Sequence, residues 1–136
     1  FLLENGFDMQ LQAKDELTVT FHDPCRLGRQ MNIYDEPRSL VSSVKGVNLV
    51  EMEHHGEDGL CCGVSSMMAC NENSRALRLQ RFDEVMATGA EMMLTSCPKC
   101  VSHFECLKFE GDPRHDFEIL DVVSFLARQV EAARSD

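Results

Sequence analysis

The sequence predicts an α/β fold in which a parallel four-stranded sheet carries helices on both faces. Short β-rich segments alternate with segments of helical periodicity, which is the pattern of β-α-β units. A cysteine or a cysteine pair also follows each of the first three predicted strands. The carboxyl ends of parallel strands meet at one edge of a sheet, where ligands bind in such folds. We therefore expect the cysteines at the C-terminal ends of the strands to form one site.

The first half of the chain predicts two strands and one helix. Residues 1–16 read as a connector from a preceding region. Residues 17–22, within "LTVTFHD", alternate and are β-rich, and residues 47–52 ("VNLVEM") are a second strand. Between them, residues 37–44 begin with proline and are followed by Gly46, which is the usual order at the start and end of a helix.

The second half predicts two further strands, each followed by a helix. Residues 73–89 form the preceding helix and place four apolar side chains at helical spacing, namely Ala76, Leu79, Phe82 and Met86. Residues 91–96 and 117–121 are the strands. Pro98 lies in the first turn of the helix between them, and Asp121 N-caps the last helix. The apolar stripe of that last helix is Val122, Phe125, Leu126 and Val130.

The composition indicates one globular domain over residues 17–136. Hydrophobic residues make up 43% of the 136 residues, so the chain can bury a core. A net charge of −10 argues against nucleic acid and against an anionic membrane surface. No apolar run approaches the roughly 20 residues that span a bilayer. We expect a cytoplasmic fragment of a longer protein, which reaches a membrane only through a partner.

Seven cysteines, an odd number, favour metal binding or redox chemistry over a disulfide framework. Five of them follow the predicted strands: Cys25, Cys61, Cys62, Cys97 and Cys100. The intervals are 35 residues from Cys25 to Cys61 and 34 residues from Cys62 to Cys97. Five thiolates exceed the four ligands of a zinc ion but suit an iron–sulfur cluster. Adjacent Cys61 and Cys62 can each hold a different iron, with Gly63 allowing close approach of the backbone.

Two alternatives remain for the cysteines. Zinc is one, since thiolates are among its usual ligands. The other is a thioredoxin-like dithiol, because Cys97 and Cys100 form a Cys-x-x-Cys motif at a strand–helix junction. The dithiol alternative leaves Cys25, Cys61 and Cys62 without a role.

Three segments together resemble a known family. "HDPCRLGR" around Cys25, "CCG" at residues 61–63 and "CPKC" at residues 97–100 are similar to the cysteine-rich CCG domain. That domain occurs in the B- and D-type subunits of heterodisulfide reductase, and in iron–sulfur subunits of glycolate and lactate oxidation systems. The family pattern is a cysteine, a gap in the thirties, Cys-Cys-Gly, a gap in the low thirties and Cys-x-x-Cys. Both intervals here fit, and the resemblance covers roughly residue 17 to the C-terminus.

The resemblance implies that the five cysteines ligate one cluster. In heterodisulfide reductase this is a non-cubane [4Fe–4S] cluster that splits a disulfide, whereas other members hold zinc or a conventional cluster. It also implies redox partners with ferredoxin-type clusters or a flavin. The chain departs from many relatives in two ways: "VSSMM" follows Cys-Cys-Gly where they have more glycines, and it has one such domain rather than two.

Other residues near the motifs allow more than one interpretation. His22 either hydrogen-bonds a cluster sulfur or fixes the turn before Cys25. Cys70 and Cys106 lie outside the pattern, and we expect both to be small buried side chains. Three basic residues flank the cysteines and either offset thiolate charge, meet an anionic substrate or lie on the surface: Arg26, Arg29 and Lys99. The remaining histidines read as solvated or structural.

The sequence as a whole predicts an iron–sulfur oxidoreductase domain that transfers electrons to or from a disulfide, thiol or related substrate. A non-catalytic module, in which zinc or a cluster only shapes an interface with a partner, is the alternative from another class.

Overall fold

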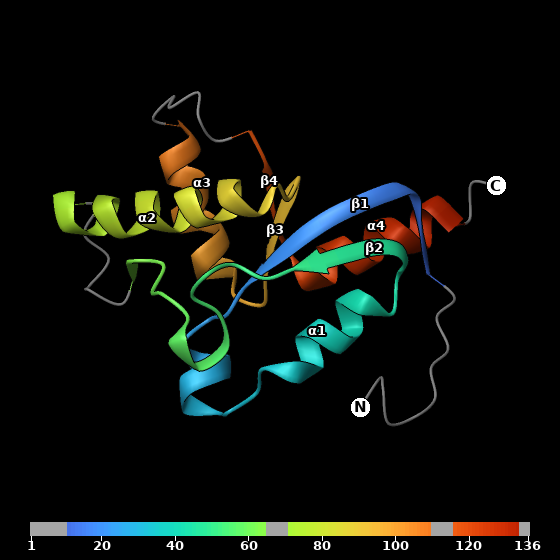
Figure 1. Ribbon diagram of the computed structural model, residues 1–136, viewed down its shortest axis with the longest axis horizontal. Helices are drawn as coiled ribbons and strands as arrows, with labels where there is room; N and C mark the ends of the chain where they lie inside the picture. Colours follow the sequence, from blue (N-terminus) through green and yellow to red (C-terminus); the bar gives the residue numbers. More distant parts are fainter. Residues whose placement is uncertain (1–10, 65–70, 110–115, 134–136) are drawn as a thin grey trace.

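The computed structural model describes residues 11–64, 71–109 and 116–133 (Figure 1). Its sheet has four strands in the order β2-β1-β3-β4, and every neighbouring pair is parallel. The strands are β1 (Gln12–His22), β2 (Lys45–Val50), β3 (Met92–Thr95) and β4 (Glu118–Asp121). The predicted α/β fold with a parallel four-stranded sheet is therefore confirmed.

In the described ranges four α-helices cover both faces of the sheet: α1 (Asp35–Ser42), α2 (Glu72–Thr88), α3 (Pro98–Phe109) and α4 (Val122–Ala133), of which the first three lie between strands. One buried cluster joins Val41 of α1 and Phe125 of α4 to the sheet. The other joins Phe82 of α2 and Phe104 of α3 to the opposite face. Figure 1 shows α1 separated by the sheet from α2 and α3. None of the helices in the described ranges is long and apolar enough to cross a bilayer.

Strand β1 begins at Gln12, five residues before the predicted start, so part of the expected connector is strand. Its first residues, "QAKDE", are polar and largely exposed, and the pairing with β2 shifts register between Gln12 and Leu17. Pairing with β3 starts only at Val19. Because this extension has one neighbouring strand and little buried apolar surface, it lacks the alternating pattern that marks a half-buried strand.

The alternation of β1 directs the residue that precedes the cysteine loop. Val19 and Phe21 point into the cluster with α1 and α4. Successive strand residues face opposite sides, so Thr20 and His22 face α2 and α3. His22 meets the ring of Phe104 edge-on, with 4.9 Å between ring centroids. The site is thus built on the α2–α3 side of the sheet.

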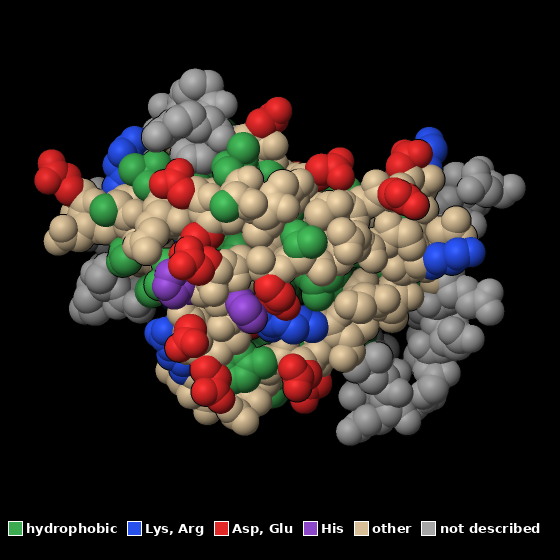
Figure 2. All heavy atoms as spheres, viewed as in Figure 1, with side chains coloured by type: hydrophobic (Ala, Val, Ile, Leu, Met, Phe, Trp, Pro, Cys, Tyr) green, Lys and Arg blue, Asp and Glu red, His purple; other side chains and the backbone are tan. Residues whose placement is uncertain are grey.

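The ends of α2 and α4 match the sequence signals, whereas α1 begins at Asp35, two residues before the predicted start at Pro37, and ends at Ser42, with Gly46 lying in β2. Asp121 accepts a hydrogen bond from the backbone N–H of Ser124, which confirms it as the N-cap of α4. Asn71 caps α2 by accepting from Ser74 N–H, and α2 ends at Gly89 in the left-handed conformation. Acidic side chains are spread over the face of the molecule in Figure 2, in keeping with its net charge of −10.

Candidate metal centre

The loops that carry the five cysteines leave one edge of the sheet. Cys25 follows β1, Cys61 and Cys62 follow β2, and Cys97 follows β3. Since these strands are parallel, their carboxyl ends lie together. Cys100 lies in the first turn of α3, which starts at Pro98. The expected meeting of loops at this edge is what the topology produces.

Cys62 and Cys100 form the centre of the site. Both are buried, and the Cys100 thiol donates to Cys62 with 3.2 Å between the two Sγ atoms. A ring nitrogen of His22 joins them, so that the three ligand atoms lie within 4.8 Å of one another. His22 is itself 1% exposed. The Cys97 side chain also bonds to Cys100. Three cysteines from two loops and one histidine from β1 therefore meet.

The two central cysteines have very different pKa values, so that Cys100 keeps its proton and Cys62 loses it. The hydrogen bond from Cys100, followed by those from His22 and the Val64 amide, lowers the pKa of Cys62 to about 4 against the opposing effect of burial. The same hydrogen bond and burial raise the pKa of Cys100. Burial lowers the pKa of His22 and keeps its imidazole neutral. At neutral pH the pair is thus one thiolate and one thiol, held beside a neutral histidine.

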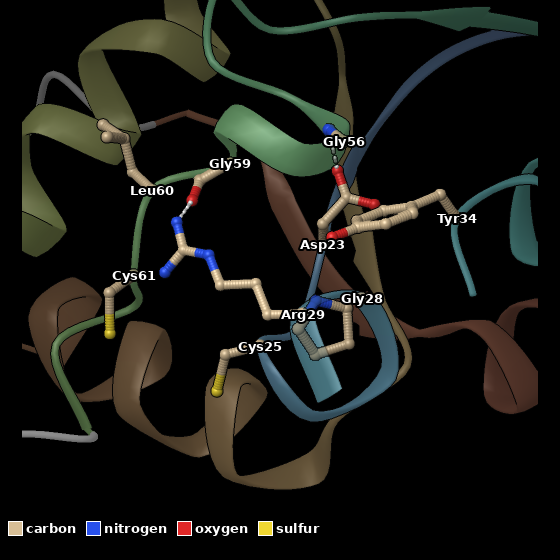
Figure 3. A pocket seen from close by; sticks show the side chains of 10 residues that line it. Asp23, Cys25, Gly28, Arg29, Tyr34, Gly56, Gly59, Leu60 and Cys61 are labelled. Carbon is tan, nitrogen blue, oxygen red and sulfur yellow. Dashed lines mark hydrogen bonds between the residues drawn. The ribbon is translucent and has the colours of Figure 1, made fainter. Parts of the chain in front are cut away.

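Cys25 and Cys61 lie beside this centre rather than in it. Both line a cavity of about 10 Å³, and their side chains extend in the same direction (Figure 3). Cys25 is exposed and begins the short π-helix Arg26–Gln30, while Cys61 is half-buried. The Cys61 sulfur accepts a hydrogen bond from the Gly63 N–H at 3.3 Å. Amide donors to sulfur thus come from the Cys-Cys-Gly loop itself.

Asp23 joins the loop of Cys25 to the loop after β2. Its carboxylate accepts two hydrogen bonds from the Arg38 guanidinium, at 2.7 and 2.9 Å, and one from the Gly56 N–H at 2.7 Å (Figure 3 shows the last). Arg38 also bonds to Glu51 at the end of β2. The bidentate pair is nearly buried, with side-chain exposures of 15% and 5%. Asp23 therefore fixes two of the cysteine loops relative to each other.

Gly63 lies in a conformation and an environment that favour glycine. Its φ of +86° is unfavourable for side chains, and a Cβ there would lie 3.0 Å from the Ser74 carbonyl oxygen and 3.3 Å from His103 Nε2. These neighbours belong to α2 and α3. The glycine thus lets the loop pack against these helices, and its expected role in allowing close approach to a cluster stays a prediction.

A buried arginine, which sequence reasoning missed, donates a hydrogen bond to the imidazole of His22. Arg81 of α2 is 0% exposed, and its Nε donates to His22 Nδ1 at 3.1 Å. Its Nη1 donates to the His54 carbonyl and to Glu84 Oε2, both at 2.6 Å. His22 lies at the end of β1 with a ring nitrogen within 4.8 Å of the Cys62 and Cys100 sulfurs, and its hydrogen bond to a cluster sulfur stays a prediction. Ser74, Arg78 and Arg81 share the buried face of α2, but their residue types gave no signal of burial in the sequence.

The other flagged residues fall outside the centre. Cys106 is exposed on α3, so the expectation of a buried side chain was wrong for it, and Cys70 lies outside the described residues. Arg26 and Lys99 are on the surface, and Arg29 donates to the Gly59 carbonyl (Figure 3). His103 is a structural residue, bonded to the Ser74 hydroxyl.

The donor set fits a thiophilic metal. A preformed thiolate, a thiol 3.2 Å away and further cysteines on adjoining loops are soft ligands of the kind that bind zinc or iron–sulfur clusters. Thiolates without a metal would repel one another, which is why this arrangement of cysteines suits a cation or a cationic cluster.

Comparison with known proteins places these features in a family. Residues 19–105 match the cysteine-rich domain family CCG. Over 134 residues the chain is 33% identical to the probable iron-sulfur-binding oxidoreductase FadF of Bacillus subtilis, covering 97% of this chain and 19% of that protein. It is 38% identical over 112 residues to the D-type subunit of the dihydromethanophenazine:CoB–CoM heterodisulfide reductase of Methanosarcina mazei, covering 81% and 27%.

A third relative is the B-type subunit of the CoM/CoB fumarate reductase of Methanothermobacter marburgensis, with 28% identity over 129 residues, covering 93% of this chain and 25% of that protein. No solved structure is significantly similar to the chain. The chain thus spans about a fifth to a quarter of the length of these relatives. With residues 19–105 of 136 matched, the chain belongs to the cysteine-rich CCG domain family.

Proposed function

We propose that this chain is the iron–sulfur redox domain of a larger oxidoreductase. Its cluster, a [4Fe–4S] cluster of the non-cubane type, is held by Cys25, Cys61, Cys62, Cys97 and Cys100. It transfers electrons between a partner's redox groups and a disulfide, thiol or related substrate. The observation that carries the proposal is the buried pair of Cys62 and Cys100, whose sulfurs lie 3.2 Å apart although the residues come from two different loops.

The chain's own residues have distinct parts in this function. When bound, the cluster supplies one-electron chemistry and iron sites for sulfur. Cys62 is ready to bind metal at neutral pH, while Cys100 has to release its proton first. The Val64 amide and His22 donate hydrogen bonds to Cys62, and such bonds to sulfur tune the potential of a cluster. Asp23 and Arg38 hold the Cys25 loop in place.

Redox partners follow from the relatives. The names of two of them, one from a heterodisulfide reductase and one from a fumarate reductase, describe parts of enzymes with several subunits. We propose that this domain likewise exchanges electrons with subunits or domains that carry ferredoxin-type clusters or a flavin. It is cytoplasmic and comes to a membrane only through such a partner.

Metal analysis after anaerobic preparation tests the proposal. We expect brown protein with about four irons and matching acid-labile sulfide per chain, and an electron paramagnetic resonance signal in one redox state. Reduction of a model disulfide by the loaded protein, driven by a low-potential electron donor, tests the substrate class. Colourless protein that holds one zinc even after iron and sulfide reconstitution would refute the cluster.

A zinc-stabilised docking module is the second candidate. It is favoured by one observation, that His22, Cys62 and Cys100 together offer the nitrogen and sulfur donors of a zinc site. In that case zinc would bind tightly and stabilise the fold, and the loaded protein would have no redox signal and no disulfide reductase activity.

A further inference from the structure

Arg81 of α2 reaches the centre through a buried hydrogen bond to His22. The guanidinium Nε donates to His22 Nδ1 at 3.1 Å, and both side chains are buried, at 0% and 1% exposure. A guanidinium is protonated in proteins and has no acceptor site. His22 Nδ1 must therefore be the acceptor in this contact.

The acceptor role at Nδ1 determines the other ring nitrogen. A neutral imidazole carries one N–H and one acceptor nitrogen, so a lone pair used at Nδ1 places the proton on Nε2. The hydrogen bond accepted at Nδ1 also excludes the doubly protonated imidazolium, so the ring of His22 is neutral. A ring nitrogen of His22 lies within 4.8 Å of the Cys62 and Cys100 sulfurs, and because Nδ1 is engaged by Arg81, the nitrogen left to face Cys62 is Nε2–H. A nitrogen that carries a proton has no lone pair to give to a metal.

We infer that Arg81 is a positioning residue that makes His22 an N–H donor to the Cys62 sulfur and prevents His22 from becoming a metal ligand. The predicted effect on a bound cluster rests on the proposed function. The tautomer of His22 does not depend on that function. Of the three residues that meet in the centre, Cys62 and Cys100 are then metal ligands, and His22 is a hydrogen-bond donor.

The surroundings hold Arg81 and His22 in this arrangement. Glu84 accepts from Arg81 Nη1 at 2.6 Å and also bonds to His54 Nδ1 at 2.8 Å, so the guanidinium is anchored on its far side. Phe104 packs edge-on against His22, with 4.9 Å between the ring centroids. Turning the imidazole over would put a carbon in front of Arg81 Nε and leave a buried donor without an acceptor. Within the described ranges Arg81 Nη2 already has no partner, so a second loss would be costly.

The consequence for a bound cluster is a higher reduction potential. Hydrogen bonds to cluster sulfurs stabilise the reduced, more negative state. The N–H of His22 is such a donor toward Cys62, and the hydrogen bond from Arg81 to Nδ1 determines which ring nitrogen carries it. The same arrangement disfavours a zinc site that needs a nitrogen from His22.

Nitrogen NMR on the metal-free, reduced protein tests the histidine directly. We expect wild-type protein with ¹⁵N-labelled histidine to show His22 as a single Nε2–H tautomer, with the signal assigned by its absence in His22→Gln. In Arg81→Met we expect a mixture of tautomers. Arg78→Met is the matched control, because Arg78 is an equally buried arginine of α2 that bonds to Ser74 and His103 carbonyls instead. It should leave the His22 tautomer unchanged.

Iron content and midpoint potential of the loaded protein form the second arm. His22→Leu should keep its iron and have a lower potential than wild type. His22→Gln, whose amide nitrogen is as many bonds from Cα as Nε2, should restore most of the difference. Arg81→Met should lower the potential more than Arg78→Met does, although each variant removes one buried positive charge.

The outcomes separate this inference from the proposed function. An Nδ1–H tautomer or a mixture in wild-type protein overturns the role of Arg81, and this result needs no variant that folds. Loss of iron in both folded His22 variants makes His22 a ligand and also overturns it. A single Nε2–H tautomer in wild-type protein that never takes up iron would leave Arg81 in its role and refute the cluster instead.

Discussion

The Sγ atoms of Cys62 and Cys100 lie 3.2 Å apart, although the two residues are 38 positions apart in the chain. One belongs to the loop after β2 and the other to the first turn of α3, so the contact joins two of the loops at the sheet edge. Because the hydrogen bond between them lowers the pKa of Cys62 to about 4, a thiolate is present at neutral pH. The contact therefore brings a thiolate and a thiol from two loops together in the buried part of the site.

Gly63→Ala should destabilise the domain by more than backbone strain alone. A non-glycine residue in the left-handed region costs roughly 1–2 kcal/mol. At φ +86° the added methyl would also meet the Ser74 carbonyl oxygen at 3.0 Å, which has to move. We expect a loss of about 2–4 kcal/mol in the free energy of unfolding, measured by denaturant titration of the metal-free protein.

The matched control for that substitution is Gly89→Ala at the end of α2. Gly89 has a φ of +71°, but a Cβ there would have no neighbour within 4 Å. It should show the strain without the clash and lose about 1 kcal/mol. Equal losses in both variants would mean that the Cys-Cys-Gly loop does not pack against α2 as described.

Asp23→Asn should weaken the domain and the hold on the Cys25 loop. The variant leaves the nearly buried Arg38 without its bidentate carboxylate, and losing one partner of such a pair costs about 3 kcal/mol. The free energy of unfolding measures the loss. Glu118→Gln is the control, because Glu118 and Arg128 form an ion pair in which both side chains are about half exposed. Its loss should stay below about 1 kcal/mol, and a comparable loss in both variants would contradict the role of Asp23.

Asp121→Ala should remove the N-cap of α4 and make the free energy of unfolding less dependent on pH under acidic conditions. Hydrogen bonds from the Ser124 hydroxyl, then from nearby amides, lower the pKa of Asp121 below its usual 3.8. A carboxyl with a lowered folded pKa stabilises the protein above its unfolded pKa and loses that contribution as pH falls through the folded value. We expect a loss of about 1 kcal/mol at pH 7 that shrinks below pH 3.8. A difference between wild type and variant that stays constant down to the acid transition would count against the cap.

The sequence predicts those parts of the fold whose cores are purely apolar. The stripe of α4 is buried as expected at Val122, Phe125 and Leu126, because this helix covers a hydrophobic face of the sheet. The strand–helix order and the cysteines after the strands follow from the same local signals.

The prediction fails on α2, where the buried face is polar. Of the expected stripe, Ala76 and Met86 are exposed, while Arg78 and Arg81 are buried. Arginine at a core position is rare, so hydrophobic periodicity assigns it to the surface. Hydrogen-bond partners make this burial possible, among them His22 for Arg81 and the His103 carbonyl for Arg78, and partners this far away in the chain cannot be read from local sequence.

Cys61→Ser and Cys62→Ser should each damage the cluster, whereas Cys106→Ser should not. We propose that the members of the adjacent pair hold different irons, so neither can replace the other, and a serine oxygen binds cluster iron less well than a thiolate. Cys106 is exposed and lies six residues beyond Cys100 on α3, about 9 Å along the helix axis.

Iron content and the electron paramagnetic resonance signal compare the three variants, with circular dichroism to check that each folds. Full iron and an unchanged signal in either pair variant would rule out the two-iron arrangement. Loss of the cluster from folded Cys106→Ser would mean that the ligand set includes a cysteine outside the five.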